Sequence, residues 1–244
     1  MDMLSSKFLD SCRRDKGRVL RGENMTRIET FVDAAFAFAF TMLVISIDNI
    51  PDTTNELLAL SQDIPAFILS CAVVGSIWVA HSTWSRTFGL QDGVTIVLSL
   101  ALVVLVLIFV YPIKLMIQVS VMYLSNGRIG MQPSENMEWT DAANLFAYFG
   151  LGLISLSVIL IAFYQNALRY KVELGLNEIE LYFCRRSSFV WLVVAMTAAL
   201  SCILAKFFLT EENISTAGLL YNSLVLTIPA VNYIGAKYSN SPAF

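Results

Sequence analysis

Two side chains that can exchange protons stand inside apolar stretches of this sequence, Asp33 and His81. Asp33 follows Arg27 early in one stretch, and His81 precedes Arg86 near the end of the next. On two helices that run in opposite directions, about 9 Å of rise separates Arg27 from Asp33 and about 7.5 Å separates His81 from Arg86. Because the acid and the imidazole reach similar depths, we expect Asp33 to accept a hydrogen bond from His81 or from the indole N–H of Trp78.

A carboxylate inside a membrane is costly, by about 2.5–3.5 kcal/mol on the milder insertion scale, so Asp33 should have a partner within the protein. Its hydrogen bond would join the first two helices. Two alternatives stay open. Asp33 and His81 could be satisfied separately by backbone or water, or they could form a proton relay in a secondary transporter.

The rest of the sequence offers no catalytic or metal-binding pattern. A single histidine rules out ligation of haem by two histidines of one chain, and no H-E-x-x-H, G-x-S-x-G or clustered carboxylate pair occurs. The cysteines form no C-x-x-C pair. We expect no enzymatic activity, cofactor, metal site, disulfide or nucleic-acid partner. The cysteines are Cys12, Cys71, Cys184 and Cys202.

The elements that position these residues are helices in a lipid bilayer. Hydrophobic residues make up 57% of the chain and charged residues 14%, against roughly 25% charged in soluble domains. Crossing a bilayer takes about 20 helical residues. The apolar runs of this length cover 28–47, 64–85, 94–118, 142–168, 187–209 and 214–236. The sequence predicts an all-α, polytopic membrane protein with six transmembrane helices in one domain, 27–238.

Lys and Arg predict the orientation, because cytoplasmic loops carry an excess of both. With the N-terminus inside, the outer side holds only Lys114, Arg128 and Lys206. The inner side holds Lys7, Arg13, Arg14, Lys16, Arg18, Arg21, Arg27, Arg86, Arg169, Lys171, Arg185, Arg186 and Lys237. We therefore expect a multi-pass protein of the cell membrane with both termini in the cytoplasm.

The segments outside the spans are short. Residues 1–26 form a basic N-terminal segment that anionic lipid would attract to the cytoplasmic face, and 239–244 form a short tail. The charged segment 169–186 is interpreted as a solvated continuation of a helix. A signal peptide is the competing interpretation of the first span, but no A-x-A site follows Ile47 and the basic leader is long.

At 100° per residue, the first helix gathers Phe38, Met42 and Ile45 on one stripe, which Phe31 and Ala34 extend toward its start. Asp33 points away from this stripe. Phe36 and Phe40 lie about 160° from Phe38 and are expected to pack on neighbouring helices.

The order Arg27-x-x-x-Phe31-Val32-Asp33, followed by "AAFAFAFTMLVISID", resembles a signature of the transmembrane protein 175 family of potassium channels, found in prokaryotes and in lysosomes. That signature is R-x-x-x-F-S-D ahead of an apolar helix. Trp78-x-x-His81 resembles the family's W-x-x-H pattern on its second helix, and "VYPIKLM" is weakly similar to the end of its third. The resemblance covers roughly residues 27–118; the second half matches only in the number and length of its helices.

The resemblance implies a six-helix repeat whose first helix lines a central pore. A chain with one repeat would assemble as a homotetramer that conducts potassium ions. The family's narrowest ring maps onto Phe38, Met42 and Ile45, the stripe already found from helical geometry, with Thr41 as a pore-adjacent hydroxyl. The structural motif that braces the helix from behind maps onto Arg27, Phe31, Asp33, Trp78 and His81.

Such a pore would discriminate by size and by the cost of removing water from the ion, and this chain has no T-V-G-Y-G run with which to build a carbonyl filter. Potassium holds its hydration shell less tightly than sodium. Val32 replaces the serine of the signature and Phe38 replaces an aliphatic side chain, so the ion preference is less firmly predicted than the fold. The Thr41 hydroxyl could instead bond to a carbonyl of its own helix.

Two rival functions remain. A secondary transporter would use Asp33 and His81 as its proton relay, but transporters commonly show paired repeats and helices broken at the midplane. Pro112 and Pro229 are interpreted as kinks. A purely structural membrane protein is the other, after the enzyme or haem subunit that the absence of motifs disfavours, and a silent bilayer recording would favour it.

Overall fold

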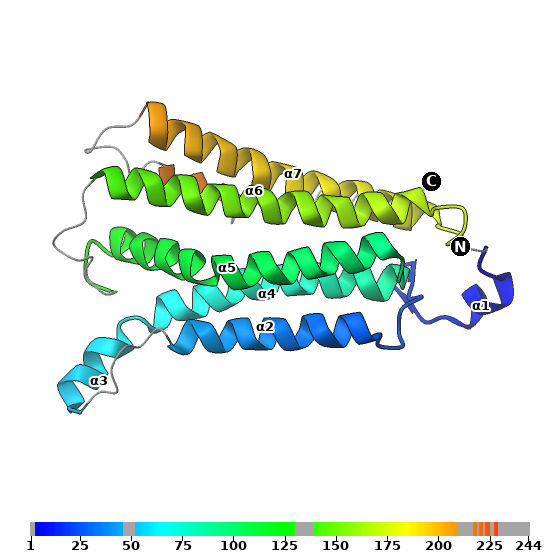
Figure 1. The fold of residues 1–244 in the computed structure, drawn as a ribbon, viewed down its shortest axis with the longest axis horizontal. Helices are drawn as coiled ribbons and strands as arrows, with labels where there is room; N and C mark the ends of the chain where they lie inside the picture. The colour runs from blue at the N-terminus through cyan, green and yellow to red at the C-terminus, as the bar shows by residue number, and fades with distance from the viewer. Residues whose placement is uncertain are drawn as a thin grey trace.

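Long helices and a small N-terminal region make up this computed structural model (Figure 1). It describes residues 3–45, 52–129 and 139–208, together with the pairs 217–218, 220–221, 223–224 and 227–228. The elements in chain order are α1 (Ser6–Ser11), β1 (Arg14–Asp15), β2 (Arg18–Val19), α2 (Arg27–Ile45), α3 (Thr54–Ser61), α4 (Ile64–Phe88), α5 (Gly93–Leu124), α6 (Trp139–Arg169) and α7 (Glu178–Phe207).

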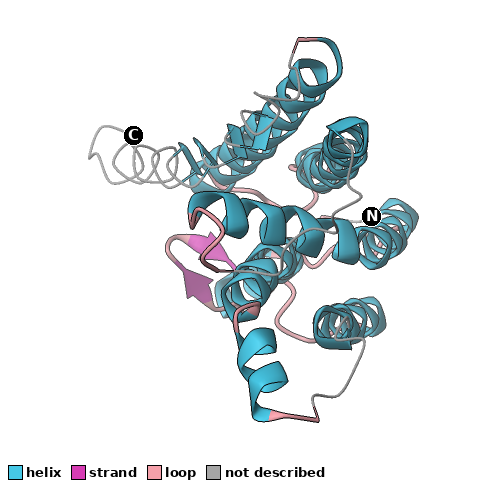
Figure 2. Ribbon diagram, turned by 90° about the vertical axis from the view of Figure 1, so that its left-hand side faces the viewer, coloured by secondary structure: helices cyan, strands magenta, loops and turns pink. Residues whose placement is uncertain are grey.

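The long helices α2, α4, α5, α6 and α7 lie side by side along the long axis of the molecule (Figures 1 and 2). Helix α1 and the antiparallel pair β1 and β2 lie at one end of this bundle, and α3 projects from the other. Helix α5 contacts α2, α4 and α6, while α7 packs on α6. The bundle therefore has α2 at one side and α7 at the opposite side.

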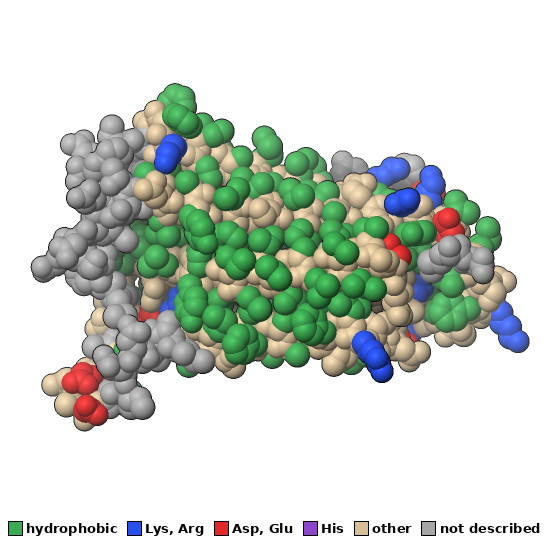
Figure 3. All heavy atoms as spheres, in the orientation of Figure 1, with side chains coloured by type: hydrophobic (Ala, Val, Ile, Leu, Met, Phe, Trp, Pro, Cys, Tyr) green, Lys and Arg blue, Asp and Glu red, His purple; other side chains and the backbone are tan. Residues whose placement is uncertain are grey.

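Four of the described helices are long and apolar enough to cross a membrane. They are Ile64–Phe88, Gly93–Leu124, Ala143–Arg169 and Glu178–Phe207. Helix α2 carries Arg27, Glu29 and Asp33 within its first two turns. On the face drawn in Figure 3, hydrophobic side chains cover the middle of the molecule, and Lys, Arg, Asp and Glu lie toward its two ends. This banding is what a bilayer requires of a spanning protein.

Local sequence sets several helix ends. Gly89 ends α4 with a φ of 61°, a left-handed conformation that glycine adopts without steric cost, and its N–H donates to the Ser85 carbonyl. A Cβ on Gly22 would stand 2.5 Å from the same carbonyl oxygen, so only glycine lets the N-terminal segment pass this close to α4. Helix α7 begins with a capping box between Asn177 and Glu180.

The main core lies between α2, α4, α5 and α6. The Trp84 indole N–H donates to the Phe163 carbonyl at 2.8 Å, and the two rings lie 4.7 Å apart between centroids. This pair joins α4 to α6. The fully buried hydrophobic side chains around it include Phe36, Leu43, Ile77, Phe88, Leu102, Leu156 and Leu160.

Four of the predicted spans correspond to helices of the structure. The runs 28–47, 64–85, 94–118 and 142–168 match α2, α4, α5 and α6, although α5 continues through Pro112 to Leu124. The sixth predicted run, 214–236, lies largely outside the described residues.

The fifth predicted span, 187–209, also falls on a helix, α7, which begins earlier, at Glu178. Helix α6 ends at Arg169, so the charged segment 169–186 continues a helix only from Glu178 onward, as the N-terminal part of α7. The interpretation of this segment as solvated fails at Glu180. Glu180 has no exposed surface. A carboxylate can be buried when an opposite charge and hydrogen bonds compensate for its lost hydration, and Arg21 supplies both here.

Candidate functional site

The start of α2 is fixed by a capping box that the sequence carries as Thr26-x-x-Glu29. The Thr26 hydroxyl accepts the Glu29 backbone N–H at 3.2 Å, and the Glu29 carboxylate accepts the Thr26 N–H at 2.7 Å. The second carboxylate oxygen of Glu29 accepts a short hydrogen bond from the Ser85 hydroxyl. Because Ser85 lies in the last turn of α4, one side chain both caps α2 and joins it to its neighbour.

One turn further along, Asp33 makes a second link between the same helices. Its Oδ1 accepts the indole N–H of Trp78 at 2.7 Å. This confirms the predicted hydrogen bond between the first two spans, with Trp78 as the partner. A buried or half-buried carboxylate is stabilised by such a donor, and the bond fixes how α2 is rotated against α4.

His81, one turn after Trp78 on α4, is buried in the core and has a hydrogen-bond partner of its own. It is 3% exposed, its Nε2 lies 3.5 Å from the Ser99 hydroxyl of α5, and its ring packs edge-on against Phe163 of α6 at 5.2 Å between centroids. The structure therefore brings Asp33 to Trp78 and His81 to Ser99. The two titratable groups expected to share one site have separate hydrogen-bond partners.

Helix α2 has one buried face and one exposed face. Val32, Phe36, Ala39 and Leu43 are between 0% and 1% exposed and face the core. They recur every three or four residues, which places them on one side of the helix. The opposite side includes Phe31 at 50% and Phe38 at 55% exposed. This uncovered face of α2 is available to a second copy of the chain, to water or to lipid.

The predicted constriction residues lie on or beside that uncovered face. Phe38 and Thr41 are exposed, and Met42 is partly buried against the core. The Thr41 hydroxyl donates to the Phe38 carbonyl at 2.7 Å, the bond within its own helix that the sequence left open. Ile45 is the last residue of α2, and its side chain lies outside the described part of the structure.

Arg27 and Phe31, the other members of the predicted bracing motif, are both exposed on the surface of this chain. Together with Thr26, Ile28, Gln91, Ile96 and Leu100 they line an open pocket of about 420 Å³ between the starts of α2 and α5. In the described part of the chain, therefore, the motif joins α2 to another helix through the bond between Asp33 and Trp78.

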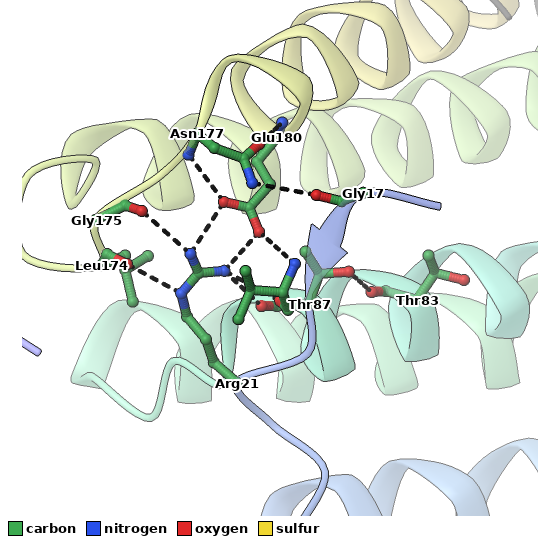
Figure 4. A network of polar contacts seen from close by, with 9 residues as sticks. Gly17, Arg21, Thr83, Thr87, Leu174, Gly175, Asn177 and Glu180 are labelled. Carbon is green, nitrogen blue, oxygen red and sulfur yellow. Dashed lines mark hydrogen bonds and ion pairs between the residues drawn. The ribbon is translucent and has the colours of Figure 1, made fainter. Parts of the chain in front are cut away.

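An anchor that sequence reasoning missed lies just before α2. The Arg21 guanidinium donates to both oxygens of Glu180, at 2.7 and 2.9 Å, and the two side chains are 2% and 0% exposed. Its Nε donates to the Leu174 carbonyl at 2.9 Å and a terminal nitrogen to the Gly175 carbonyl at 3.3 Å (Figure 4). Arg21 thereby ties the chain ahead of α2 to the start of α7.

Arg21 also reaches α4, because it donates to the carbonyl of Thr87 at 3.3 Å. Glu180 has two further donors, the backbone N–H of Val19 at 2.8 Å and that of Asn177 at 3.0 Å. No local pattern points to this network, because its two charged members are 159 positions apart. The capping box at Thr26 and Glu29, by contrast, follows a local T-x-x-E pattern.

The comparisons with known proteins fall on the same helices. A family described as "Endosomal/lysosomal potassium channel TMEM175" matches residues 27–112, from the start of α2 into α5. A "Potassium channel" of Marivirga tractuosa is 32% identical over 190 residues, covering 75% of this chain and 76% of that protein. The chain belongs to the TMEM175 family.

The TMEM175 fold extends beyond the matched segment. The crystal structure of a variant of the potassium channel MtTMEM175, in complex with a nanobody–MBP fusion protein, superposes with a TM-score of 0.76 at 29% identity. The match covers 93% of this chain and 99% of that chain. The similarity to TMEM175 therefore includes α6 and α7, for which the sequence resemblance offered only helix number and length.

Proposed function

We propose that this chain forms a potassium-preferring cation channel in the cell membrane, with α2 of each subunit of a homotetramer lining a central pore. Both relatives described above are named as potassium channels. Neither name favours the alternative of a secondary transporter, and Asp33 and His81 have different hydrogen-bond partners rather than a bond to each other. Six spans, with both termini in the cytoplasm, complete the proposed subunit.

The observation that carries the proposal is the uncovered face of α2. One side of this helix is fixed against the core by Val32, Phe36, Ala39 and Leu43, and two hydrogen-bonded links join it to α4. A pore-lining helix needs one face that is packed against its own subunit and an opposite face that the subunit leaves exposed. In the proposed tetramer Phe38, Met42 and Ile45 form the constriction, because four copies of one helix face meet around a symmetry axis.

Thr41 would supply an oxygen beside that constriction. A hydroxyl has one donor and two acceptor lone pairs. The hydrogen of Thr41 is used in the bond to the Phe38 carbonyl, at 2.7 Å. Its oxygen is thus left as an acceptor on an exposed face, the property that a passing cation requires. Dehydration at the hydrophobic ring and coordination at the hydroxyl together favour potassium over sodium.

Recording from purified protein in planar bilayers tests the function. We expect currents that reverse at the potassium potential in a potassium gradient, that shrink when sodium replaces potassium, and that do not change reversal with a proton gradient. Currents that follow the proton gradient would favour the transporter. Silence in bilayers that contain verified, folded protein would favour a structural role.

The place of α2 is tested by cross-linking. In a background without the native cysteines, Phe38→Cys should form disulfide-linked subunits under mild oxidation, because symmetry brings this position close to its own copies. Met196→Cys is the matched control, since Met196 is also exposed, at 64%, but lies on α7 at the far side of the bundle. Cross-linking of Met196→Cys alone would place another helix at the axis.

A further inference from the structure

A buried cation, Lys114 in the segment VYPIKLM, contacts the far end of α2. The Lys114 ammonium of α5 donates to the Leu43 carbonyl of α2 at 3.0 Å. The same nitrogen lies 3.3 Å from a carboxylate oxygen of Asp63, and the two side chains are 7% and 13% exposed. The Gln118 amide donates to the other oxygen of Asp63 at 2.8 Å.

The arrangement suits the electrostatics of the two helix ends. Leu43 lies in the last described turn of α2, toward the end of the helix that carries the negative end of the helix dipole. Asp63 immediately precedes α4, where N–H groups carry partial positive charge. Lys114 and Asp63 therefore complement both helix ends as well as each other. Through these contacts the end of α2 is joined to the start of α4, across the connection that includes α3.

Leu43 is also close to the residues proposed to line the pore. It immediately follows Met42 and lies two positions after Thr41. Its own side chain is fully buried, so its backbone is fixed from the protein side while Thr41 stays exposed. Because a helix is rigid over one turn, a hydrogen bond to the Leu43 carbonyl sets the rotation of this whole turn.

We propose that Lys114 is a positioning residue for permeation: paired with Asp63, it holds the outer turn of α2 so that Thr41 and Met42 face the pore. This role of Lys114 rests on the proposed function. It makes Lys114 a determinant of ion preference that does not itself contact the ion. The inner half of α2 is held by Asp33 and Trp78, and the outer half by Lys114.

The test measures the potassium-to-sodium permeability ratio and the single-channel conductance of purified variants in planar bilayers. Lys114→Met keeps much of the side-chain volume but loses the charge and the donors. We expect it to change the permeability ratio by about fivefold or more, the effect of losing roughly one hydrogen bond. Lys114→Arg retains a cation and donors and should restore most of the wild-type ratio.

Lys206→Met is the matched control. Lys206 lies near the end of α7, is exposed, and donates to the Asn144 side chain at 3.2 Å. It removes the same charge from the predicted outer side without touching α2, so the ratio and the conductance should stay at the wild-type values. An equal change in both variants would indicate a general effect of surface charge and would overturn the proposal.

Gln118→Met keeps the test decisive if Lys114→Met fails to assemble. This variant leaves the Lys114 contacts to α2 but frees one oxygen of Asp63, so a smaller change in the same direction is expected. If Lys114→Met folds and its permeation is unchanged, the positioning role is overturned. If Lys114→Met does not fold, unchanged permeation in Gln118→Met overturns it. Absence of current from the wild-type protein would instead overturn the proposed function, and this inference with it.

Discussion

Arg21 and Glu180 form a buried, doubly hydrogen-bonded ion pair between the segment that leads into α2 and the first turn of α7. The pair joins parts of the chain that are 159 positions apart. Removing one partner of a buried pair leaves an uncompensated charge, whereas the pair itself can contribute little net stability. We therefore expect its main effect to be on how the N-terminal segment is positioned against the bundle.

Arg21→Met should lower the stability of the protein by about 3–5 kcal/mol, because Glu180 would keep its charge inside the protein without a cation. The measurement is the apparent unfolding temperature of the purified protein in detergent. The double variant Arg21→Met with Glu180→Leu should recover much of the loss, since it removes both buried charges.

Asp15→Asn provides the control for this prediction. It breaks the ion pair of Arg18 and Asp15, at 2.7 Å, but the Asp15 side chain is 49% exposed. A surface pair of this kind contributes about 1 kcal/mol or less. If Asp15→Asn and Arg21→Met lowered the unfolding temperature equally, burial would not be the cause.

The hydrogen bond of Asp33 to Trp78 predicts a defect in assembly rather than in permeation. Asp33→Ala should reduce the yield of folded oligomer, measured by size-exclusion chromatography. The substitution removes the acceptor of the Trp78 indole N–H and with it one of two hydrogen-bonded links between α2 and α4. Trp78→Phe keeps the ring and should have a similar but weaker effect, since Asp33 can take water instead. Normal assembly of Asp33→Ala would contradict the role of this acid as a brace.

The sequence was sufficient to predict most of the helices and the bond of Asp33, for physical reasons. Apolar run length is a direct requirement of the bilayer, so the spans that match α2, α4, α5 and α6 were found from it. Counting residues on antiparallel helices placed Asp33 at a depth similar to that of His81, with Trp78 one turn away as the other candidate donor. Both arguments use only local sequence and the geometry of a straight helix.

The features that were missed depend on pairing between distant residues. Glu180 looked solvated because it lies among other charges, and nothing near it in the sequence points to Arg21. Lys114 was assigned to the outer side, but its contact with the Leu43 carbonyl depends on how α5 packs against α2. His81 was considered as a hydrogen-bond partner of Asp33, but its Nε2 lies 3.5 Å from the Ser99 hydroxyl, because depth alone does not fix the direction in which a side chain points around its helix.

Phe38 provides a test of the proposed constriction. Phe38→Ala should raise conductance and weaken ion preference, because a smaller side chain widens a hydrophobic ring and lowers the cost of passage for hydrated ions. Phe38→Asn should do so more strongly, since its amide can hydrogen-bond to water in the ring. Single-channel recording measures both. If neither substitution altered conductance or ion preference, the constriction would lie elsewhere.

Thr41 tests whether a hydroxyl contributes to ion preference, because valine has nearly the same shape without the oxygen. Thr41→Val should lower the potassium-to-sodium permeability ratio while leaving assembly unchanged, since the lost bond to the Phe38 carbonyl is within one helix and that carbonyl keeps its helical partner. The reversal potential in mixed potassium and sodium solutions gives the ratio. Thr30→Val is the matched control: Thr30 is also exposed on α2 and bonds back to a carbonyl of its own chain, that of Thr26 at 3.1 Å, but lies near the start of the helix. If Thr41→Val lowers the potassium-to-sodium permeability ratio and Thr30→Val does not, the selective oxygen lies in the outer half of α2. If both variants keep the wild-type ratio, the dehydration of the ion at the hydrophobic ring is the sole basis of selectivity.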